Sequence, residues 1–357
     1  MPDLEVSIIC LNNLLDKNGN TIGHLKKQIE QTIQILLHLG YPPEKIEVIA
    51  GRETLKDICC KNKQYLPCHV TDKANVEAAL GMKIQLTTNY LFTYFRARGK
   101  YVWYIFVNEI ILSMLAVLPM KRKLIATTYM NWDWYLRDAE YLGKHRKRQI
   151  KKGVNRLDLC ITTNPTCTQG KKSVYLPDYF RTEAEKKLYE VPKSDRVASV
   201  GLITPGKNVT SVIKLFCKNN IGIPLVVKGR IRDNCLTPSQ VAHINRSGKV
   251  NVTDCYLQDD DYWRLLAESK FVVVNYNTKI YGNRTSGVLL DGIFVGCIPI
   301  APIEILENNR IKGIGYTNIR QIPNLIEEYR KNNPDMLNDL SIYELEHFVK
   351  VLKPFFH

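Results

Sequence analysis

The sequence lacks an unbroken apolar run long enough to cross a membrane. Its most apolar stretch, residues 101–118, carries Asn108 and Glu109 in the middle and is followed by Pro119. Neither half reaches the roughly 20 residues that a membrane-spanning helix needs, so we expect a buried strand followed by a helix. The first residues also lack a basic segment and a long apolar segment. We therefore expect a cytoplasmic protein that is not secreted.

The sequence also lacks paired metal-binding cysteines. Its ten cysteines are scattered and show no repeated CxxC pattern, and several lie in apolar runs, where a thiol behaves as a small hydrophobic group. Cys59, Cys60, Cys68 and His69 form one loose group, but no second pair completes a zinc site. We expect reduced thiols and no metal.

Acidic residues are few compared with basic ones. The chain has 35 Asp and Glu against 50 Lys and Arg, a net charge of +15, and residues 121–156 hold eleven basic and three acidic residues, a net of +8. Such a patch attracts phosphates, anionic lipid headgroups or nucleic acid. Few aromatic residues interrupt the basic helix expected at residues 144–156, which argues against nucleic acid. Peripheral contact with an anionic membrane and a solvated helix face both stay open.

Strands and helices alternate along the chain. Residues 6–11 form an apolar run, residues 22–37 carry apolar side chains at helical spacing, and residues 46–50 repeat the strand pattern. This order predicts a parallel β-α-β unit. Further strands are expected at residues 102–107, 124–128, 159–163, 197–202, 224–228, 250–253, 271–275 and 298–301, and helices at 141–157, 209–218, 260–269 and 286–295.

The chain of 357 residues is too long for one compact core. A charged segment, residues 178–195, separates the first series of elements from the second. We expect an α/β protein of two doubly wound, Rossmann-like domains facing a cleft, with ligands at the carboxyl ends of the strands. The predicted domains are residues 1–180 and 195–340, and residues 341–357 are expected to form a helix that packs back on the first domain.

Several motifs in the second half carry a resemblance to a known family. They are residues 199–208 (SVGLITPGKN), 226–230 (VVKGR), 250–266, 271–276 (FVVVNY), 283–291 (NRTSGVLLD) and 296–301. In this order they resemble the donor-binding domain of retaining nucleotide-sugar glycosyltransferases of the GT-B fold, glycosyltransferase family 4. The resemblance covers about residues 195–305, and the first half resembles the family only in its topology.

The resemblance implies a metal-independent transferase. Such an enzyme moves a hexose from a nucleoside diphosphate sugar to a hydroxyl group of a glycan or glycolipid acceptor, and it needs no cofactor besides the nucleotide sugar. Family members use UDP-sugars or GDP-mannose, and the resemblance to the family weakly favours GDP-mannose over a UDP-hexose. The oligomeric state stays open, a homodimer included.

The resemblance also implies roles at the start of two helices. Without a metal, a diphosphate is stabilised by fixed cations and by the N–H groups at a helix N-terminus. Lys207 and Arg284 are expected on the diphosphate. Thr285, Ser286 and Gly287 are expected to present backbone N–H groups to it.

Three positions depart from the family pattern. Asn283 stands where the family has a glutamate near the reacting carbon, and we expect it on the transferred sugar as the catalytic position. Asp291 replaces a second glutamate and is expected on the ribose. Leu202 stands where the family has a diphosphate-binding arginine, and Arg230 or Arg284 is expected to replace that arginine.

In the first half, the resemblance places four residues on the acceptor side of the cleft. Gly19 and His24 belong to the loop after the first strand, where the family has a glycine-rich loop. Tyr129 and Asn131 follow the strand at residues 124–128, where the family has a histidine.

Two other functions stay open. A non-catalytic protein that binds a sugar nucleotide or a nucleic acid would explain Asn283 and the missing histidine. A sugar-nucleotide epimerase would need acidic and histidine groups that converge, and His24 and Glu109 are the candidates. The triplet at residues 259–261 consists of aspartates, but it directly precedes a helix, so we expect it to cap that helix and complement its dipole rather than to bind a metal.

Overall fold

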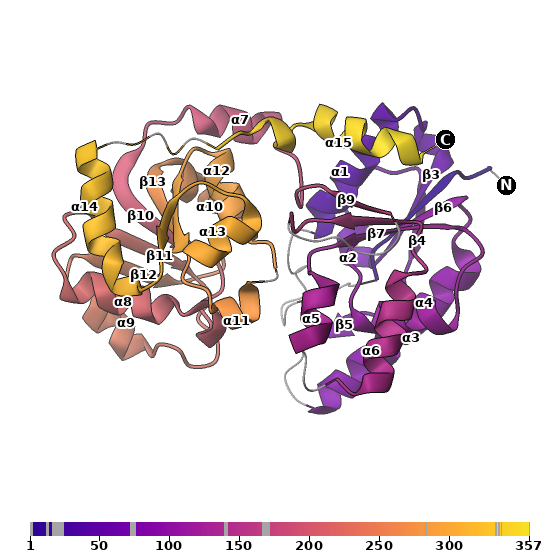
Figure 1. The fold of residues 1–357 in the computed structure, drawn as a ribbon, viewed down its shortest axis with the longest axis horizontal. Helices are drawn as coiled ribbons and strands as arrows, with labels where there is room; N and C mark the ends of the chain where they lie inside the picture. Colours follow the sequence, from indigo (N-terminus) through magenta and orange to yellow (C-terminus); the bar gives the residue numbers. More distant parts are fainter. Residues whose placement is uncertain are drawn as a thin grey trace. The chain divides into compact units, whose positions relative to one another are not determined.

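The chain forms two α/β units. The computed structural model describes residues 3–11, 14–15, 25–71, 76–138, 142–165, 172–282, 284–332, 334, 336 and 338–356. The first unit comprises Met1–Phe180 and Ser341–His357, and the second unit comprises Arg181–Leu340. Figure 1 shows both, with strands at the centre of each unit and helices outside them.

The first unit is built on a parallel sheet of seven strands in the order β4-β3-β1-β6-β7-β8-β9. All four residues of β1 and all four of β6 are buried, as expected for strands with both faces covered. The strands are β1 (Val6–Ile9), β3 (Ile46–Ala50), β4 (Asn62–Tyr65), β6 (Tyr101–Tyr104), β7 (Lys123–Thr128), β8 (Leu159–Thr162) and β9 (Ser173–Tyr175), and β2 (Leu14–Leu15) pairs separately with β5 (Val70–Thr71).

Helices cover both faces of this sheet. On one face, α3, α4, α5 and α6 enclose an apolar core around Tyr104 and Ala126. On the other face, α1 and α15 enclose a core around Ile8 and Trp103. The helices are α1 (Leu25–His38), α2 (Arg52–Leu55), α3 (Val76–Arg96), α4 (Glu109–Val117), α5 (Trp132–Asp138), α6 (Lys144–Val154) and α15 (Leu345–Leu352).

Residues near the C-terminus pack on the first unit. The helix α15 contacts α1, and the two lie side by side in Figure 1. The ring of Phe348 lies 5.6 Å from the ring of Phe180, and the ring of Phe356 lies 5.7 Å from that of Trp103. These contacts bury aromatic area and attach α15 to this sheet.

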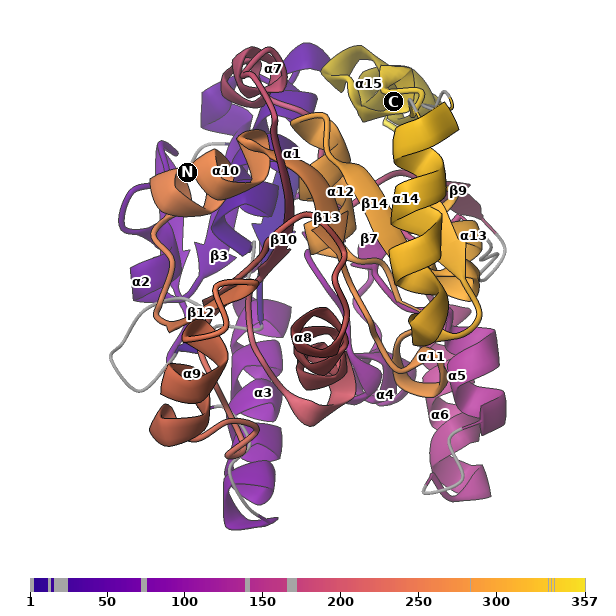
Figure 2. The same cartoon turned by 90° about the vertical axis from the view of Figure 1, so that its left-hand side faces the viewer.

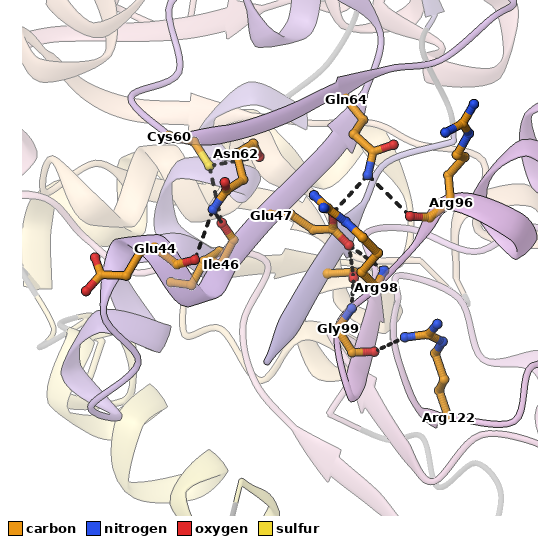
Figure 3. A network of polar contacts seen from close by, with 11 residues as sticks. Glu44, Ile46, Glu47, Cys60, Asn62, Gln64, Arg96, Arg98, Gly99 and Arg122 are labelled. Atoms are coloured by element: carbon orange, nitrogen blue, oxygen red, sulfur yellow. Dashed lines mark hydrogen bonds and ion pairs between the residues drawn. The ribbon is translucent and has the colours of Figure 1, made fainter. Parts of the chain in front are cut away.

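A buried carboxylate joins three segments at the amino end of the first sheet (Figure 3). Glu47 on β3 is fully buried. Its carboxylate accepts hydrogen bonds from Ser7 Oγ at 2.5 Å, from the Arg98 backbone N–H at 2.6 Å and from Gln64 Nε2 at 2.9 Å. Ser7 Oγ in turn accepts a hydrogen bond from the Gly99 N–H at 2.7 Å. The network satisfies a charge that would be costly to bury alone, and Glu47, Ser7 and Gly99 lie at the opposite end of the strands from their carboxyl ends.

The second unit has a parallel sheet of six strands in the order β12-β11-β10-β13-β14-β15. One face is covered by α8, α9 and α14, and the other by α7, α10 and α12. Its strands are β10 (Ser194–Val200), β11 (Leu225–Gly229), β12 (Val250–Asp254), β13 (Ser269–Val273), β14 (Ile298–Pro302) and β15 (Ile314–Tyr316). Its helices are α7 (Glu183–Tyr189), α8 (Val209–Lys218), α9 (Pro238–Asn245), α10 (Asp259–Ala267), α11 (Thr278–Tyr281), α12 (Gly287–Phe294), α13 (Ile303–Asn309) and α14 (Ile322–Asn332).

The predicted α/β architecture with two parallel sheets is confirmed. The expected strand at residues 46–50 and the expected helix at residues 209–218 match β3 and α8 in both bounds. The basic helix α6 is shorter than the predicted residues 141–157, since it begins at Lys144 and ends at Val154. Among the described residues, no helix combines the length and the apolar character that crossing a membrane requires.

Candidate functional site

The strand order of the second sheet reverses between β10 and β13. From β10 the chain continues to β11 and β12 on one side, and it then crosses to β13 on the other side. Ligands of open parallel sheets bind outside the carboxyl ends of the strands at such a reversal. The loops after β10, β11 and β13 therefore form the candidate site.

Two glycines allow the ends of β10 and β11 to approach each other. Gly201 has a φ of +96°, in the left-handed region that glycine adopts at no steric cost. A Cβ on Gly229 would collide with the carbonyl oxygen of Gly201. The Gly201 N–H donates to the carbonyl of Lys228 at 3.1 Å. Bare backbone therefore lies at this edge of the sheet, where a ligand can approach closely.

The loops after β10 and β13 are hydrogen-bonded to each other. The Asn277 N–H donates to the Gly206 carbonyl at 3.1 Å, and Asn275 Nδ2 donates to the Asn208 carbonyl at 3.1 Å. Asn208 has a φ of +48°, which asparagine tolerates better than most residues. Tyr316 donates its hydroxyl proton to Asn275 Oδ1 at 2.8 Å and so fixes this amide.

Lys207 folds back over the end of β10. Its Nζ lies 3.7 Å from the position that a Cβ on Gly201 would occupy. The same atom lies 5.7 Å from the ring centroid of Tyr276, which follows β13. Within the part of the chain that the structure describes, Lys207 forms no ion pair. A free cation thus lies where the strand order reverses.

Two tyrosines in ring contact separate Lys207 from a second cation. The rings of Tyr276 and Tyr281 are 4.8 Å apart, and the guanidinium carbon of Arg284 lies 5.5 Å from the Tyr281 ring. The Nε of Arg284 is buried and has no hydrogen-bond partner among the described residues. Lys207, Tyr276, Tyr281 and Arg284 form what we call the cation–tyrosine set.

The helix α12 begins beside this set. Ser286 is buried, and its hydroxyl oxygen caps the helix by accepting a hydrogen bond from the Leu289 N–H at 3.4 Å. The Ser286 N–H donates to Asn309 Oδ1 at 3.2 Å. Thr285 and Gly287 lie on either side and are half-buried. Since a helix N-terminus carries partial positive charge, α12 adds to the positive potential of Arg284.

Arg230 follows β11 at the same edge but has an acidic neighbour. Its Nη1 lies 4.0 Å from Asp254 Oδ1, and 42% of its side chain is exposed. Of the three cations expected on a diphosphate, Arg230 is the one with an acidic partner. It therefore contributes less uncompensated charge than Lys207 or Arg284.

Asp291 is fully buried rather than exposed at the site. The Tyr262 hydroxyl on α10 donates to its Oδ2 at 2.5 Å. Burial, together with the neighbouring carboxylate, holds the pKa of Tyr262 well above its ordinary value. This geometry speaks against the expected contact of Asp291 with a ribose, because no part of its carboxylate reaches the surface.

The remaining expected site residues are either outside the described part of the chain or in the first unit. Gly19, His24 and Asn283 fall outside the described residues. In the first unit, Tyr129 and Asn131 follow β7 at the carboxyl edge of that sheet, and the Tyr129 ring packs edge-on against Phe106 at 5.1 Å. Both therefore lie beyond the carboxyl end of β7, the side on which ligands of open parallel sheets generally bind.

The aspartate triplet at residues 259–261 lies in the first turn of α10. The N-cap is Gln258, which makes no side-chain capping bond, so the expectation that these aspartates cap the helix was wrong. Their charges complement the helix dipole. Within the described ranges, no group of three or more His, Cys, Asp or Glu side chains is placed to hold a metal ion.

Sequence reasoning missed the two tyrosines of the cation–tyrosine set. Tyr276 directly follows the expected strand at residues 271–275. Its position just after the carboxyl end of a strand could have identified it as a candidate site residue. Tyr281 belongs to the short helix α11, which no pattern in the sequence predicted.

No protein-family model matches the chain, and no curated protein matches its sequence. Solved structures do match over nearly its whole length. HepE from Anabaena in complex with UDP and glucose matches with a TM-score of 0.62 at 10% identity, covering 98% of both chains. Sucrose-phosphate synthase from Thermosynechococcus elongatus matches with a TM-score of 0.65 at 11% identity, covering 99% of this chain and 98% of the other.

The trehalose-6-phosphate synthase OtsA matches with a TM-score of 0.67 at 8% identity and covers 99% of both chains. All three comparisons extend over both sheets. Identities this low establish the architecture alone. The chain therefore has the GT-B fold that these structures share.

Proposed function

We propose that the protein is a glycosyltransferase that moves a hexose from a nucleoside diphosphate sugar to a hydroxyl group of a glycan or glycolipid. The observation that carries the proposal is the cation–tyrosine set at the strand reversal of the second sheet. Its two cations form no ion pair with a described residue, although unpaired charges of one sign repel each other. A bound anion would relieve that repulsion.

The proposed transfer has a nucleoside diphosphate as its leaving group. In the transfer, the bond between the sugar C1 and the β-phosphate oxygen breaks, and a bond from C1 to the acceptor oxygen forms. The acceptor hydroxyl gives up its proton, which passes to the leaving diphosphate oxygen, and the negative charge that develops on the diphosphate as the C1 bond breaks needs stabilisation. We assign Lys207, Arg284 and the N-terminus of α12 to this charge, with the N–H groups of Thr285 and Gly287 as donors. The Ser286 N–H is not assigned to it, because that group already donates to Asn309 Oδ1. The protein's own cations replace a metal in this role.

We assign Arg230 to the same anion in a secondary role, because Asp254 already neutralises part of its charge. Asn283 is proposed on the transferred sugar and Tyr129 and Asn131 on the acceptor, on the strength of the family resemblance. Retention of configuration at C1 is part of the same proposal.

The donor proposed for the first test is a UDP-hexose. The resemblance alone favours GDP-mannose, but the structures of HepE hold UDP and, in another complex, UDP-glucose. The cation–tyrosine set would bind the diphosphate of either nucleotide, so the base has to be determined by experiment.

Calorimetric titration of the purified protein in EDTA tests the proposal. The panel is UDP, GDP, UDP-glucose and GDP-mannose, with uridine and guanosine as controls that lack phosphate. Saturable binding of one nucleotide sugar, with much weaker binding of its nucleoside, is the expected result. No binding across the panel would contradict the assignment of the site.

Turnover separates the enzyme from the non-catalytic alternative. The protein is incubated with the nucleotide sugar that binds in calorimetry and with a mixture of glycan and glycolipid acceptors. The nucleoside diphosphate that is released is then measured. Release above the rate without protein supports transfer or hydrolysis. Tight binding without release would favour the non-catalytic protein, for which the amide of Asn283 in place of a carboxylate is the sequence argument.

A further inference from the structure

The helix α3 exposes a stripe of large apolar side chains to solvent. Leu80, Ile84, Leu91 and Phe95 are 61%, 60%, 38% and 77% exposed, respectively. Scattered exposed apolar residues are ordinary on a protein surface, but a contiguous row of them marks an interaction site. We call these four residues the α3 stripe.

The stripe runs along one face of the helix. At 100° per residue its four positions fall within an arc of about 60°, and at 1.5 Å per residue they span about 22 Å. Leu86 and Tyr90 lie on the opposite face and are buried against the sheet. The stripe is therefore the outward face of a well-anchored helix, and its exposure is a property of the folded unit.

The same helical layer carries the basic helix α6. Both α3 and α6 pack on α4, and the three helices lie together on one side of the first sheet in Figures 1 and 2. Val117, at the end of α4, is 68% exposed and adds to the apolar area. The outer surface of this layer thus combines exposed apolar side chains with a cluster of cations.

The cations of α6 are uncompensated. Its lysines and arginines form no ion pair within the part of the chain that the structure describes. We call them the α6 cations: Lys144, Arg146, Lys147, Arg148, Lys151 and Lys152. The buried side of α6 consists of Ile150, Gly153 and Val154, so most of the charge is presented outward.

We propose that this outer surface docks the protein on an anionic lipid bilayer. Apolar side chains enter the boundary between headgroups and acyl chains, and neighbouring cations are attracted to anionic headgroups. Each element alone would bind weakly, whereas the two on one helical layer reinforce each other. The proposal does not depend on the proposed glycosyl transfer, since docking needs neither donor nor acceptor.

A second copy of the chain fits this surface less well. Two copies facing each other would bring together uncompensated α6 cations on chains that carry a net charge of +15, and like charges oppose that association. Nucleic acid would use the α6 cations, but three of the four residues of the α3 stripe are aliphatic, which leaves Phe95 as the one base-stacking side chain of the stripe. The combination of both features favours lipid.

Flotation with vesicles tests the proposal on the full chain. Phosphatidylcholine vesicles with and without anionic phosphatidylserine are mixed with the protein, and the bound fraction is measured. The first variant carries Leu80→Ser, Ile84→Ser and Phe95→Ser. Its control carries Tyr256→Ser and Ile303→Ser, which replace exposed apolar residues of the second unit.

A second pair of variants tests the charges. One carries Lys144→Gln, Arg146→Gln, Lys151→Gln and Lys152→Gln. Its control removes four exposed lysines of the second unit, by Lys214→Gln, Lys218→Gln, Lys249→Gln and Lys312→Gln. Both have the same net charge, so only the location of the removed charge differs. Circular dichroism and urea unfolding establish that each variant folds.

We expect binding to the anionic vesicles and little to the neutral ones. The stripe variant should bind at least about tenfold more weakly, and the α6 variant roughly 100- to 1000-fold more weakly, while both controls bind like the wild type. Equal loss in the charge control would overturn the proposal in favour of general electrostatic adsorption. A dimer that the stripe variant converts to a monomer, or tight RNA binding without vesicle binding, would overturn it in favour of those partners.

Discussion

Removing either cation of the cation–tyrosine set should weaken binding of the diphosphate selectively. The perturbation is Lys207→Ala or Arg284→Ala. Both cations lie against tyrosine rings, at 5.7 and 5.5 Å from the ring centroids, so their positions are set before a ligand arrives. Pre-positioned groups bind without a large cost for ordering side chains.

The magnitude follows from the charge of both partners. A hydrogen bond to a charged group contributes about 1.5–3 kcal/mol, which is roughly a 10- to 150-fold increase in Kd for each variant. The two cations are linked through the contacting rings of Tyr276 and Tyr281, so the double variant should lose less than the sum of the single losses. Tyr281→Phe keeps the ring beside Arg284 and should bind within about twofold of the wild type.

The assay compares UDP, UMP and uridine by calorimetry, with GDP, GMP and guanosine in parallel. In the wild type, affinity should rise with each phosphate, and both alanine variants should lose most of that rise while nucleoside binding stays unchanged. Lys214→Ala, at an exposed position of α8, serves as the control for net charge. If nucleoside and diphosphate binding fall by the same factor, the cations do not contact the diphosphate and the reasoning fails.

Three further outcomes follow from the structure. Glu47→Ala should lower the free energy of unfolding by about 2–4 kcal/mol, because it leaves several buried donors unpaired, whereas Glu44→Ala at the exposed surface should cost less than about 0.5 kcal/mol; urea titration measures both. Gly229→Ala should abolish nucleotide binding in calorimetry even where the protein still folds, because the added Cβ collides with the Gly201 carbonyl; wild-type affinity would contradict the proposed site. Burial raises the pKa of the Cys297 thiol to about 12. Above about pH 8.5 the unfolded chain therefore holds fewer protons than the folded chain, and the free energy of unfolding falls by up to about 1.4 kcal/mol per pH unit. Cys297→Ala should flatten that fall in urea titrations from pH 8.5 to 10.5, and an unchanged slope would argue against the raised pKa.

The strands were predictable because parallel strands buried on both faces are nearly continuous apolar runs. The helix α3 was not predicted, although it is the longest of the described helices. A helix that buries one face shows an apolar stripe with polar residues opposite. In α3 both faces are apolar, since Leu86 and Tyr90 are buried while Ile84 and Phe95 are exposed, so helical periodicity does not stand out in its sequence.

The candidate site was predictable only where function depends on position along a strand or helix. Lys207 and Arg284 each precede a helix that follows a strand, so their place at the carboxyl edge could be inferred. The environment of Asp291 could not, because its partner Tyr262 comes from a different helix, 29 residues earlier in the chain. Tertiary contacts of this kind leave no local pattern in the sequence.

The cations at the two edges of the second sheet differ in the partners that surround them. At the amino edge, Arg196 pairs with Glu268 at 2.9 Å, and Lys193 donates to the carbonyls of Ala267 and Val295 at the ends of α10 and α12. The dipole at a helix C-terminus favours a cation, although burial lowers the pKa of Lys193. Both side chains are thus engaged by groups of the fold itself. Their charges need no ligand.

At the carboxyl edge the arrangement is reversed. Arg284 lies just before the N-terminus of α12, where the helix dipole disfavours a cation, and neither it nor Lys207 has an acidic partner among the described residues. An arrangement that costs stability in the free protein becomes favourable once an anion lies between the cations and the helix. Ligand binding should therefore raise Tm in proportion to the phosphate charge of the nucleotide. This difference between the two edges of one sheet is the physical reason for assigning the site to the carboxyl edge.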